Sequence, residues 1–103
     1  MYMQVEGKLV RFEWDKWNIE KNYLKHGTTP EEAEEAFISD GSYFFSDVKH
    51  SKTEERFILL GKTLENKNLF IIFTMRGKKV RIISARRMHE SEVKKYEKAK
   101  KDT

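Results

Sequence analysis

The spacing of apolar side chains predicts helices in the first half of the chain and an antiparallel sheet in the second. A short apolar-rich run over residues 9–14 predicts a first strand. Asp15 then offers an N-cap oxygen for a helix that extends to about Lys25, and Gly27 supplies the left-handed residue that ends it. One face of this helix is predicted to carry side chains spaced i, i+4 and i+7, namely Ile19, Tyr23 and His26.

A second helix is predicted to begin almost at once. Thr29, Pro30 and Glu32 supply an N-cap hydroxyl, a proline at the first helical position and the carboxylate of a capping box. The buried stripe is expected to consist of small and aromatic residues, Ala33, Ala36 and Phe37. Three carboxylates are expected to face water, those of Glu31, Glu34 and Glu35.

The second half reads as strands joined by short links. A turn at residues 40–42 leads to a short strand at 43–45 and a polar loop at 48–53, followed by strands at 56–60, 69–75 and 79–85. Links of hairpin length predict an antiparallel meander of three or four strands. The run 69–73 is apolar on both faces, so it should be central. A last helix is expected from about residue 89 to 101. The order predicts an α+β fold, β-α-α followed by the meander and a C-terminal helix.

Length and composition narrow the class of protein. At 103 residues, we expect one domain over 1–103. The chain has no cysteine, so it has no disulfide framework and no thiolate metal site. No apolar run approaches the roughly 20 residues that span a bilayer, and residues 1–10 contain no signal-peptide core. These features predict a cytoplasmic protein that does not use a membrane.

Charge is distributed unevenly. Residues 28–55 hold eight acidic and two basic side chains, a net of −6, whereas residues 74–103 hold eleven basic and four acidic ones, a net of +7. A basic C-terminal third is typical of nucleic-acid binders. A solvated lysine-rich helix would explain half of the surplus, but it explains the arginines poorly.

The arginines lie on or beside the last predicted hairpin. A guanidinium cannot act as a base, but it can clamp a phosphate with two parallel hydrogen bonds. In a regular strand Arg86 and Arg87 point to opposite faces, so both reach one phosphate only if the strand ends or bulges there. By the same parity Arg81 is expected on the face opposite Arg86. Arg56 is expected to form an ion pair on the sheet surface.

An ordered series of short motifs resembles the BrnT toxin family. The series runs from about residue 11 to 97 and comprises Phe12-Glu13-Trp14-Asp15, Asn22, Lys25-His26-Gly27, Glu55-Arg56, Gly61, Arg76-Gly77, Ile82-Ile83-Ser84-Ala85-Arg86-Arg87 and Tyr96. The resemblance implies a RelE/ParE-like fold and a ribonuclease toxin of a type II toxin–antitoxin system that arrests translation. It also implies a BrnA-type antitoxin with a ribbon-helix-helix domain, and a joint complex that binds operator DNA through the antitoxin.

RNA cleavage of this kind needs cations around the phosphorus and groups that transfer protons. Arg76, Arg86 and Arg87 are the expected cations, and the alternative for each is a structural ion pair. His26 or Glu55 is the expected proton-transfer group. The alternative for His26 is a histidine that binds the last carbonyls of its helix, and the alternative for Glu55 is a salt bridge. His89 is a third candidate for proton transfer, since it lies close enough in sequence to share the arginine surface. Further RNA contacts are expected from Lys25, Trp17 and Arg56. No pair of histidines has ligand spacing, so neither a metal nor another cofactor is expected.

Two other functions fit the same residues. A non-catalytic nucleic-acid-binding module needs the basic surface but no proton-transfer group. A degenerate toxin that acts through protein contacts would use its arginines to hold an acidic antitoxin segment. The fold relatives of these toxins include gyrase poisons, so the resemblance alone does not fix the target.

Overall fold

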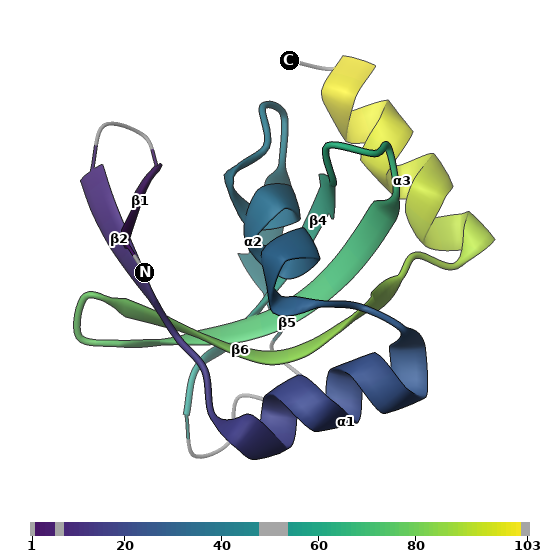
Figure 1. Cartoon of the computed structure of the whole chain (residues 1–103). Helices are drawn as coiled ribbons and strands as arrows, with labels where there is room; N and C mark the ends of the chain where they lie inside the picture. Colours follow the sequence, from purple (N-terminus) through teal and green to yellow (C-terminus); the bar gives the residue numbers. More distant parts are fainter. Residues whose placement is uncertain (1, 6–7, 48–53, 102–103) are drawn as a thin grey trace.

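The structure is a computed structural model of the chain, and it describes residues 2–5, 8–47 and 54–101 (Figure 1). The predicted loop at 48–53 lies outside the described residues. The elements are, in chain order, β1 (Tyr2–Val5), β2 (Lys8–Glu13), α1 (Lys16–His26), α2 (Pro30–Ile38), β3 (Tyr43–Ser46), β4 (Arg56–Lys62), β5 (Asn68–Arg76), β6 (Lys79–Arg87) and α3 (Glu90–Lys101).

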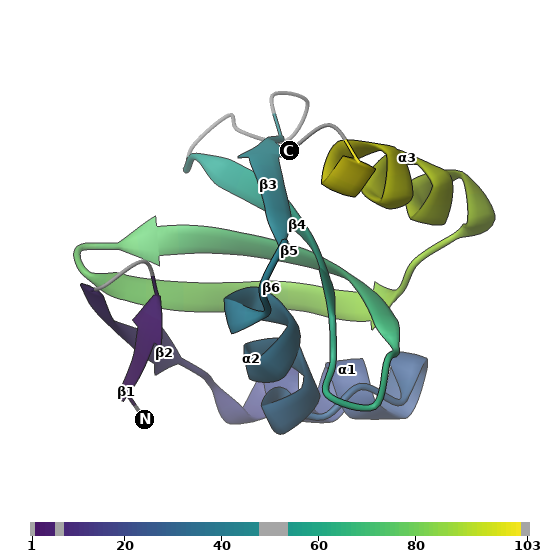
Figure 2. The ribbon, with the colours of Figure 1, turned by 90° about the horizontal axis from the view of Figure 1, so that it is seen from above.

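The strands form one six-stranded sheet in the order β1-β2-β6-β5-β4-β3. β2 pairs in parallel with β6, and every other neighbouring pair is antiparallel. Two views at right angles place α1 and α2 on one side of the sheet and α3 on the other (Figures 1 and 2). The α+β class is therefore confirmed. Strand β1 was not predicted from the sequence.

The two first helices begin and end where the sequence indicates. The Asp15 side chain accepts from the Asn18 amide at 2.7 Å, and Gly27 ends α1 with φ +67°. In α2 the Thr29 hydroxyl and the Glu32 carboxylate each accept from the other's backbone N–H, which completes the capping box.

The predicted stripe of α1 is partly buried, since Ile19 and His26 are half-buried. Tyr23 is 57% exposed, whereas Asn18 and Asn22 are buried. Asn22 Oδ1 accepts from the Ala85 backbone N–H at 3.2 Å. The pairing of β2 with β6 stops at Glu13, so the edge of β6 beyond it lacks a strand partner, and α1 supplies one by side chain. The contact that positions α1 is polar, and an apolar periodicity could not reveal it.

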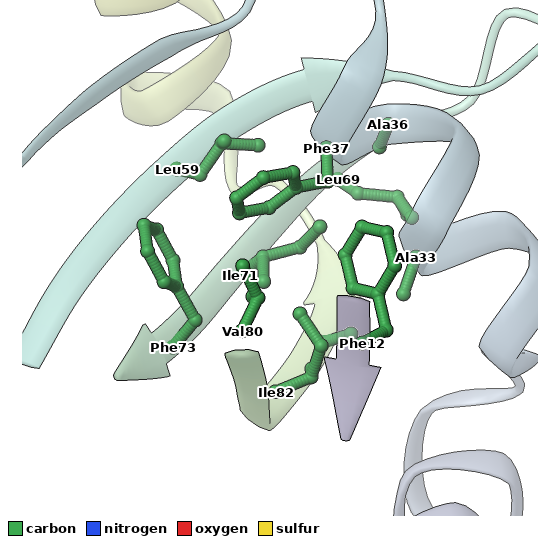
Figure 3. Packing of buried hydrophobic residues seen from close by; sticks show 11 residues of the cluster. Phe12, Ala33, Ala36, Phe37, Leu59, Leu69, Ile71, Phe73, Val80 and Ile82 are labelled. Atoms are coloured by element: carbon green, nitrogen blue, oxygen red, sulfur yellow. The ribbon is translucent and has the colours of Figure 1, made fainter. Parts of the chain in front are cut away.

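The hydrophobic core lies between α2 and the sheet. Phe37 meets the rings of Phe12 and Phe73 edge-on, with centroids 5.2 and 5.0 Å apart (Figure 3). α2 sits so close to β4 that a Cβ at Gly61 would stand 2.2 Å from the Ala36 carbonyl oxygen. The cluster consists of Phe12, Ala33, Ala36, Phe37, Leu59, Leu69, Ile71, Phe73, Val80, Ile82 and Ala85.

One carboxylate predicted to face water is buried instead. Glu34 is only 4% exposed, and its Oε2 accepts from Trp14 Nε1 at 2.8 Å. The expectation for Glu34 was wrong because the side chain of Trp14, which directly follows β2, packs beside α2 and donates its indole N–H to the Glu34 carboxylate. A hydrogen bond of this kind offsets part of the cost of burying a carboxylate.

A bulge in β6 changes the parity of its arginines. Ile72 pairs with Ser84 and Phe73 pairs with Ile82, so Ile83 is an extra residue in the ladder. Because of this extra residue, side chains on the two sides of Ile83 lie on faces opposite to those expected from a regular alternation along β6. Arg81 is therefore on the same face as Arg86, and the prediction that they point to opposite faces is wrong.

Candidate functional site

Three arginines share the face of the sheet opposite α2. Arg56 and Arg81 both lie opposite Thr74, which gives the row Arg56–Thr74–Arg81 across β4, β5 and β6. Arg86 lies opposite Phe70 on the same face, nearer the end of β6. Directly opposed residues of neighbouring strands point the same way, so these guanidinium groups face the side that carries α3.

Arg86 is held by α3. Its Nη1 and Nη2 donate to the two carboxylate oxygens of Glu92 at 2.8 and 2.9 Å, and its guanidinium carbon lies 3.9 Å from the centre of the Phe70 ring. The same Glu92 accepts from the His89 backbone N–H at 2.7 Å, which caps the first turn of α3. The hydrogen bond from Arg86 is the main reason that the pKa of Glu92 is lowered from its usual value. The pair therefore joins the end of β6 to the start of α3.

His26, the last residue of α1, is half-buried. Its pKa is lowered, first because burial disfavours the charged ring and then because Lys25, Arg86 and Lys21 are positive. A histidine with a lowered pKa is mainly neutral at pH 7, so one ring nitrogen has a lone pair that can accept a proton. The helix end thus combines a proton acceptor with a cationic surrounding.

Arg87 follows on the other face of β6, opposite Leu69, and its side chain is exposed. Within the part of the chain that the structure describes, its guanidinium forms no ion pair or hydrogen bond. Its carbonyl accepts from Arg86 Nη1 at 3.0 Å, so the two arginines are coupled through the backbone. Arg86 and Arg87 are both paired with β5, so their side chains leave the strand on opposite faces, and β6 ends at Arg87.

The other predicted catalytic residues lie at the far end of the hairpin. Arg76 is opposite Lys79 beside the β5–β6 turn and forms an exposed ion pair with Glu54 at 3.5 Å. Glu55 is exposed next to the start of β4, where its carbonyl accepts from the Thr74 hydroxyl at 2.7 Å. Along a strand that rises about 3.3 Å per residue, the six steps from Phe70 to Arg76 cover about 20 Å. Arg76 and Glu55 therefore lie near one end of the hairpin, whereas Arg86 and Arg87 lie near the other.

Sequence reasoning missed Arg81. Its guanidinium donates to Glu13 Oε1 at 3.4 Å and to Asp15 Oδ2 at 2.5 Å. The pKa of Asp15 is lowered, first by the Asn18 amide and also by Arg81. The adjacent apolar residues Ile82 and Ile83 break the alternation of β6 and are the sequence signal of the bulge that turns Arg81 to this face.

An aromatic and basic stripe follows the outer surface of α1. Trp17, Lys21 and Lys25 are spaced i, i+4 and i+8, which places them on one side of the helix, and the stripe ends beside His26. The Trp17 side chain is 72% exposed, which is unusual for the largest apolar residue. An exposed indole on the same side of a helix as two lysines is suited to stacking on a nucleobase.

Across residues 2–5, 8–47 and 54–101, no three side chains of His, Cys, Asp or Glu are grouped so that they could hold a metal ion. None of the helices in this part of the chain is long and apolar enough to span a bilayer.

Comparison with known proteins defines the class. Residues 14–92 match the family described as the ribonuclease toxin BrnT of type II toxin–antitoxin systems. The chain is therefore a member of a ribonuclease-toxin class, and within that class it belongs to the BrnT family.

The fold agrees with a solved member of that family. The 1.1 Å crystal structure of the Brucella abortus ribonuclease toxin BrnT superposes with a TM-score of 0.60 at 20% sequence identity. The match covers 79% of this chain and 99% of that one. At this identity the likeness establishes the fold alone. A search of curated proteins finds no match.

Proposed function

We propose that this toxin is a metal-independent endoribonuclease whose cleavage site lies where α1 and β6 end. His26 takes the proton of the attacking 2′-hydroxyl, and Arg86 and Arg87 surround the scissile phosphate. The observation that carries this proposal is a half-buried His26 at the end of α1, whose pKa is lowered by burial and, among other charges, by that of Arg86 near the end of β6.

The reaction follows from the chemistry of RNA. The 2′-oxygen forms a bond to its neighbouring phosphorus while the bond from phosphorus to the 5′-oxygen breaks. The proton of the 2′-hydroxyl passes to His26, and the departing 5′-oxygen takes up a proton. The products are a 2′,3′-cyclic phosphate and a 5′-hydroxyl. A positioned base contributes about 10²- to 10⁴-fold to such a step, and fixed cations stabilise the negative charge that develops on phosphorus.

The two arginines are expected to act differently. Arg86 is already neutralised by Glu92, and through Nη1 it fixes the carbonyl of Arg87. Arg87 is exposed and has no ion-pair partner among the described residues. We therefore assign direct phosphate binding mainly to Arg87, whereas Arg86 orders the end of β6 and adds its remaining donors. Glu55 and Arg76 lie too far along the hairpin to act on the same phosphate.

Two surfaces next to the proposed cleavage site could bind the RNA on either side of the cleaved bond. Trp17 and Lys25 on α1 offer stacking and a phosphate contact next to His26. Arg56 lies on the sheet face that Arg86 shares and is assigned an RNA contact there, whereas Arg81 on the same face is already paired with Glu13 and Asp15. These contacts are electrostatic in large part, so RNA affinity is expected to fall as salt rises.

The family implies an antitoxin partner and an RNA target. We propose that the antitoxin is BrnA-like, with a ribbon-helix-helix domain, and that the toxin and antitoxin form a hetero-oligomer. In this complex the antitoxin supplies the contacts to operator DNA. The toxin supplies basic surface that the antitoxin must cover in order to neutralise it.

A cleavage assay tests the activity. Purified toxin is incubated with a 5′-labelled RNA transcript in the presence of EDTA, and the products are analysed for their ends. Products with 2′,3′-cyclic phosphate ends are expected. Salt-sensitive retention of intact RNA without products would instead identify a binding module, and neither cleavage nor retention would identify a protein that acts only through protein contacts.

A further inference from the structure

We propose that the outer edge of β3 is the docking site for an extended, acidic and apolar segment of the antitoxin, which adds a seventh strand to the sheet. The inference rests on the proposed function only in taking the partner to be the antitoxin. The edge itself is defined by β3, its backbone and the helix beside it.

β3 is one end of the sheet order, and over the residues that the structure describes no strand pairs with its outer side. The Asp47 amide donates to the Arg56 carbonyl at 2.8 Å, which marks Asp47 and Arg56 as a hydrogen-bonded pair of the ladder. Such pairs alternate in an antiparallel ladder, so Phe45 and Tyr43 also direct their backbone groups toward β4. The N–H and C=O groups of Phe44 and Ser46 consequently point outward. An unpaired edge of this kind is a template for another strand.

The side chains of β3 lack the features that protect an edge strand. Tyr43 and Phe44 are 38% and 57% exposed, and the four residues Tyr43–Ser46 include no charge and no proline. Phe44 lies on the α2 side of the sheet, with its ring 6.4 Å from that of Phe73, so it continues the hydrophobic core to the surface. A partner strand with an apolar side chain beside Phe44 would extend that core.

The other side of β3 is bordered by α3, which carries the charge. Lys95 Nζ lies 4.0 Å from the centre of the Phe45 ring, and the aliphatic part of Lys100 passes Gly41, just before β3, with Cε 3.5 Å from where a Cβ would stand. Two lysines of α3 thus lie beside Phe45 and beside Gly41 on this side of the sheet. Alternate side chains of an added strand would meet Phe44 on one face and these lysines on the other, which calls for apolar and acidic residues in alternation.

A second copy of the chain fits this edge less well. Two β3 strands paired with each other would bring two copies of Lys95 and Lys100 to the same side, and like charges in such positions repel. Charge complementarity therefore favours an acidic partner over self-association.

Hydrogen exchange measures the proposed strand directly. The toxin is compared free and in complex with the antitoxin, defined as the protein whose co-expression abolishes growth arrest. We expect the Phe44 and Ser46 amides to exchange at least tenfold more slowly in the complex. Unchanged exchange at both amides in a stable complex would overturn the proposal. Equal protection in the free toxin, with the mass of a dimer, would overturn it in favour of a second copy.

A pair of variants separates the backbone from the side chain. Ser46→Pro removes the outward N–H but leaves the ladder with β4 intact, whereas Ser46→Ala keeps the N–H. We expect Ser46→Pro to weaken antitoxin binding at least tenfold, and Ser46→Ala to bind within twofold of the parent. Equal binding by both variants would contradict the added strand, and the exchange experiment decides the case if Ser46→Pro does not fold. RNA cleavage by the free variants is measured in parallel, so a failed ribonuclease assignment is distinguished from a failed docking site.

Discussion

Glu92 holds Arg86 by two parallel hydrogen bonds, Nη1 to Oε1 at 2.8 Å and Nη2 to Oε2 at 2.9 Å. This pair joins the end of β6 to the first turn of α3, because Glu92 also accepts from the His89 amide. Arg86, which we assign to the cleavage site, thus also holds α3 to the sheet. Experiments can separate its role in RNA cleavage from its role in stability.

The anchor predicts a stability that depends on pH. Glu92→Gln should lower the free energy of unfolding by about 1 to 3 kcal/mol at pH 7, since it weakens hydrogen bonds to a charged partner. The folded-state pKa of Glu92 is lowered, so its contribution is present above the unfolded value, about 4.5, and is lost as the pH falls through the folded pKa. Urea unfolding between pH 3 and 7 measures this, and the difference between parent and variant should shrink as the pH falls. A constant difference across that range would show that the charge of Glu92 does not matter.

His26 should set the acid limb of the cleavage rate. Its pKa is lowered from 6.5, and a general base must be neutral to act, so the rate should rise with pH through a midpoint below 6.5. Lys25→Gln removes a nearby positive charge and should move that midpoint upward, although burial, the larger cause, remains. Single-turnover rates from pH 4.5 to 8 and an NMR titration of the His26 ring test both statements. A midpoint above 6.5, or one that Lys25→Gln leaves in place, would speak against His26 as the base.

Trp17→Ala should separate RNA binding from stability. The indole is 72% exposed, so its removal should change the free energy of unfolding by less than about 0.5 kcal/mol. Loss of one stacked base should weaken RNA binding by about 1 to 3 kcal/mol, roughly 5- to 150-fold. Tyr23→Ala, on the same helix and 57% exposed, is the control and should bind RNA like the parent. Equal affinities for the parent and the Trp17 variant would remove Trp17 from the RNA surface.

Gly61→Ala should disturb the packing of α2 on β4. The added methyl group would stand 2.2 Å from the Ala36 carbonyl oxygen, which belongs to the helix backbone and cannot rotate away. We expect a loss of at least about 2 kcal/mol in thermal or urea unfolding. Leu64→Ala, in the nearby turn and 84% exposed, should change stability by less than about 0.5 kcal/mol. An unfolding midpoint for Gly61→Ala equal to that of the parent would mean that α2 can shift freely.

Local signals in the sequence predicted most of the fold. The capping box at Thr29, the N-cap at Asp15 and Gly27 act over a few residues, so they were predicted correctly. The errors involve contacts between distant segments. Glu34 is buried by a tryptophan 20 residues away, and α1 is positioned by the bond from Ala85 to Asn22, 63 residues apart. No periodicity within one segment encodes these contacts.

The relative positions of the candidate site residues could not be predicted from the sequence. Arg86 and Arg87 lie at one end of the β5–β6 hairpin, and Arg76 lies at the other. Sequence order could not show this, because a hairpin brings its two ends together only in the folded sheet. The bulge at Ile83 reversed the expected parity of Arg81 in the same way: one extra residue moves every later side chain to the other face.

We propose that proton transfer occurs at the end of β6 and not at the tip of the hairpin. The most direct test compares single-turnover RNA cleavage by His26→Ala and Glu55→Ala at pH 7 in EDTA, after circular dichroism has shown both to be folded. We expect a loss of about 10²- to 10⁴-fold for His26→Ala and a rate within about twofold of the parent for Glu55→Ala. A large loss for Glu55→Ala with full activity in His26→Ala would contradict it.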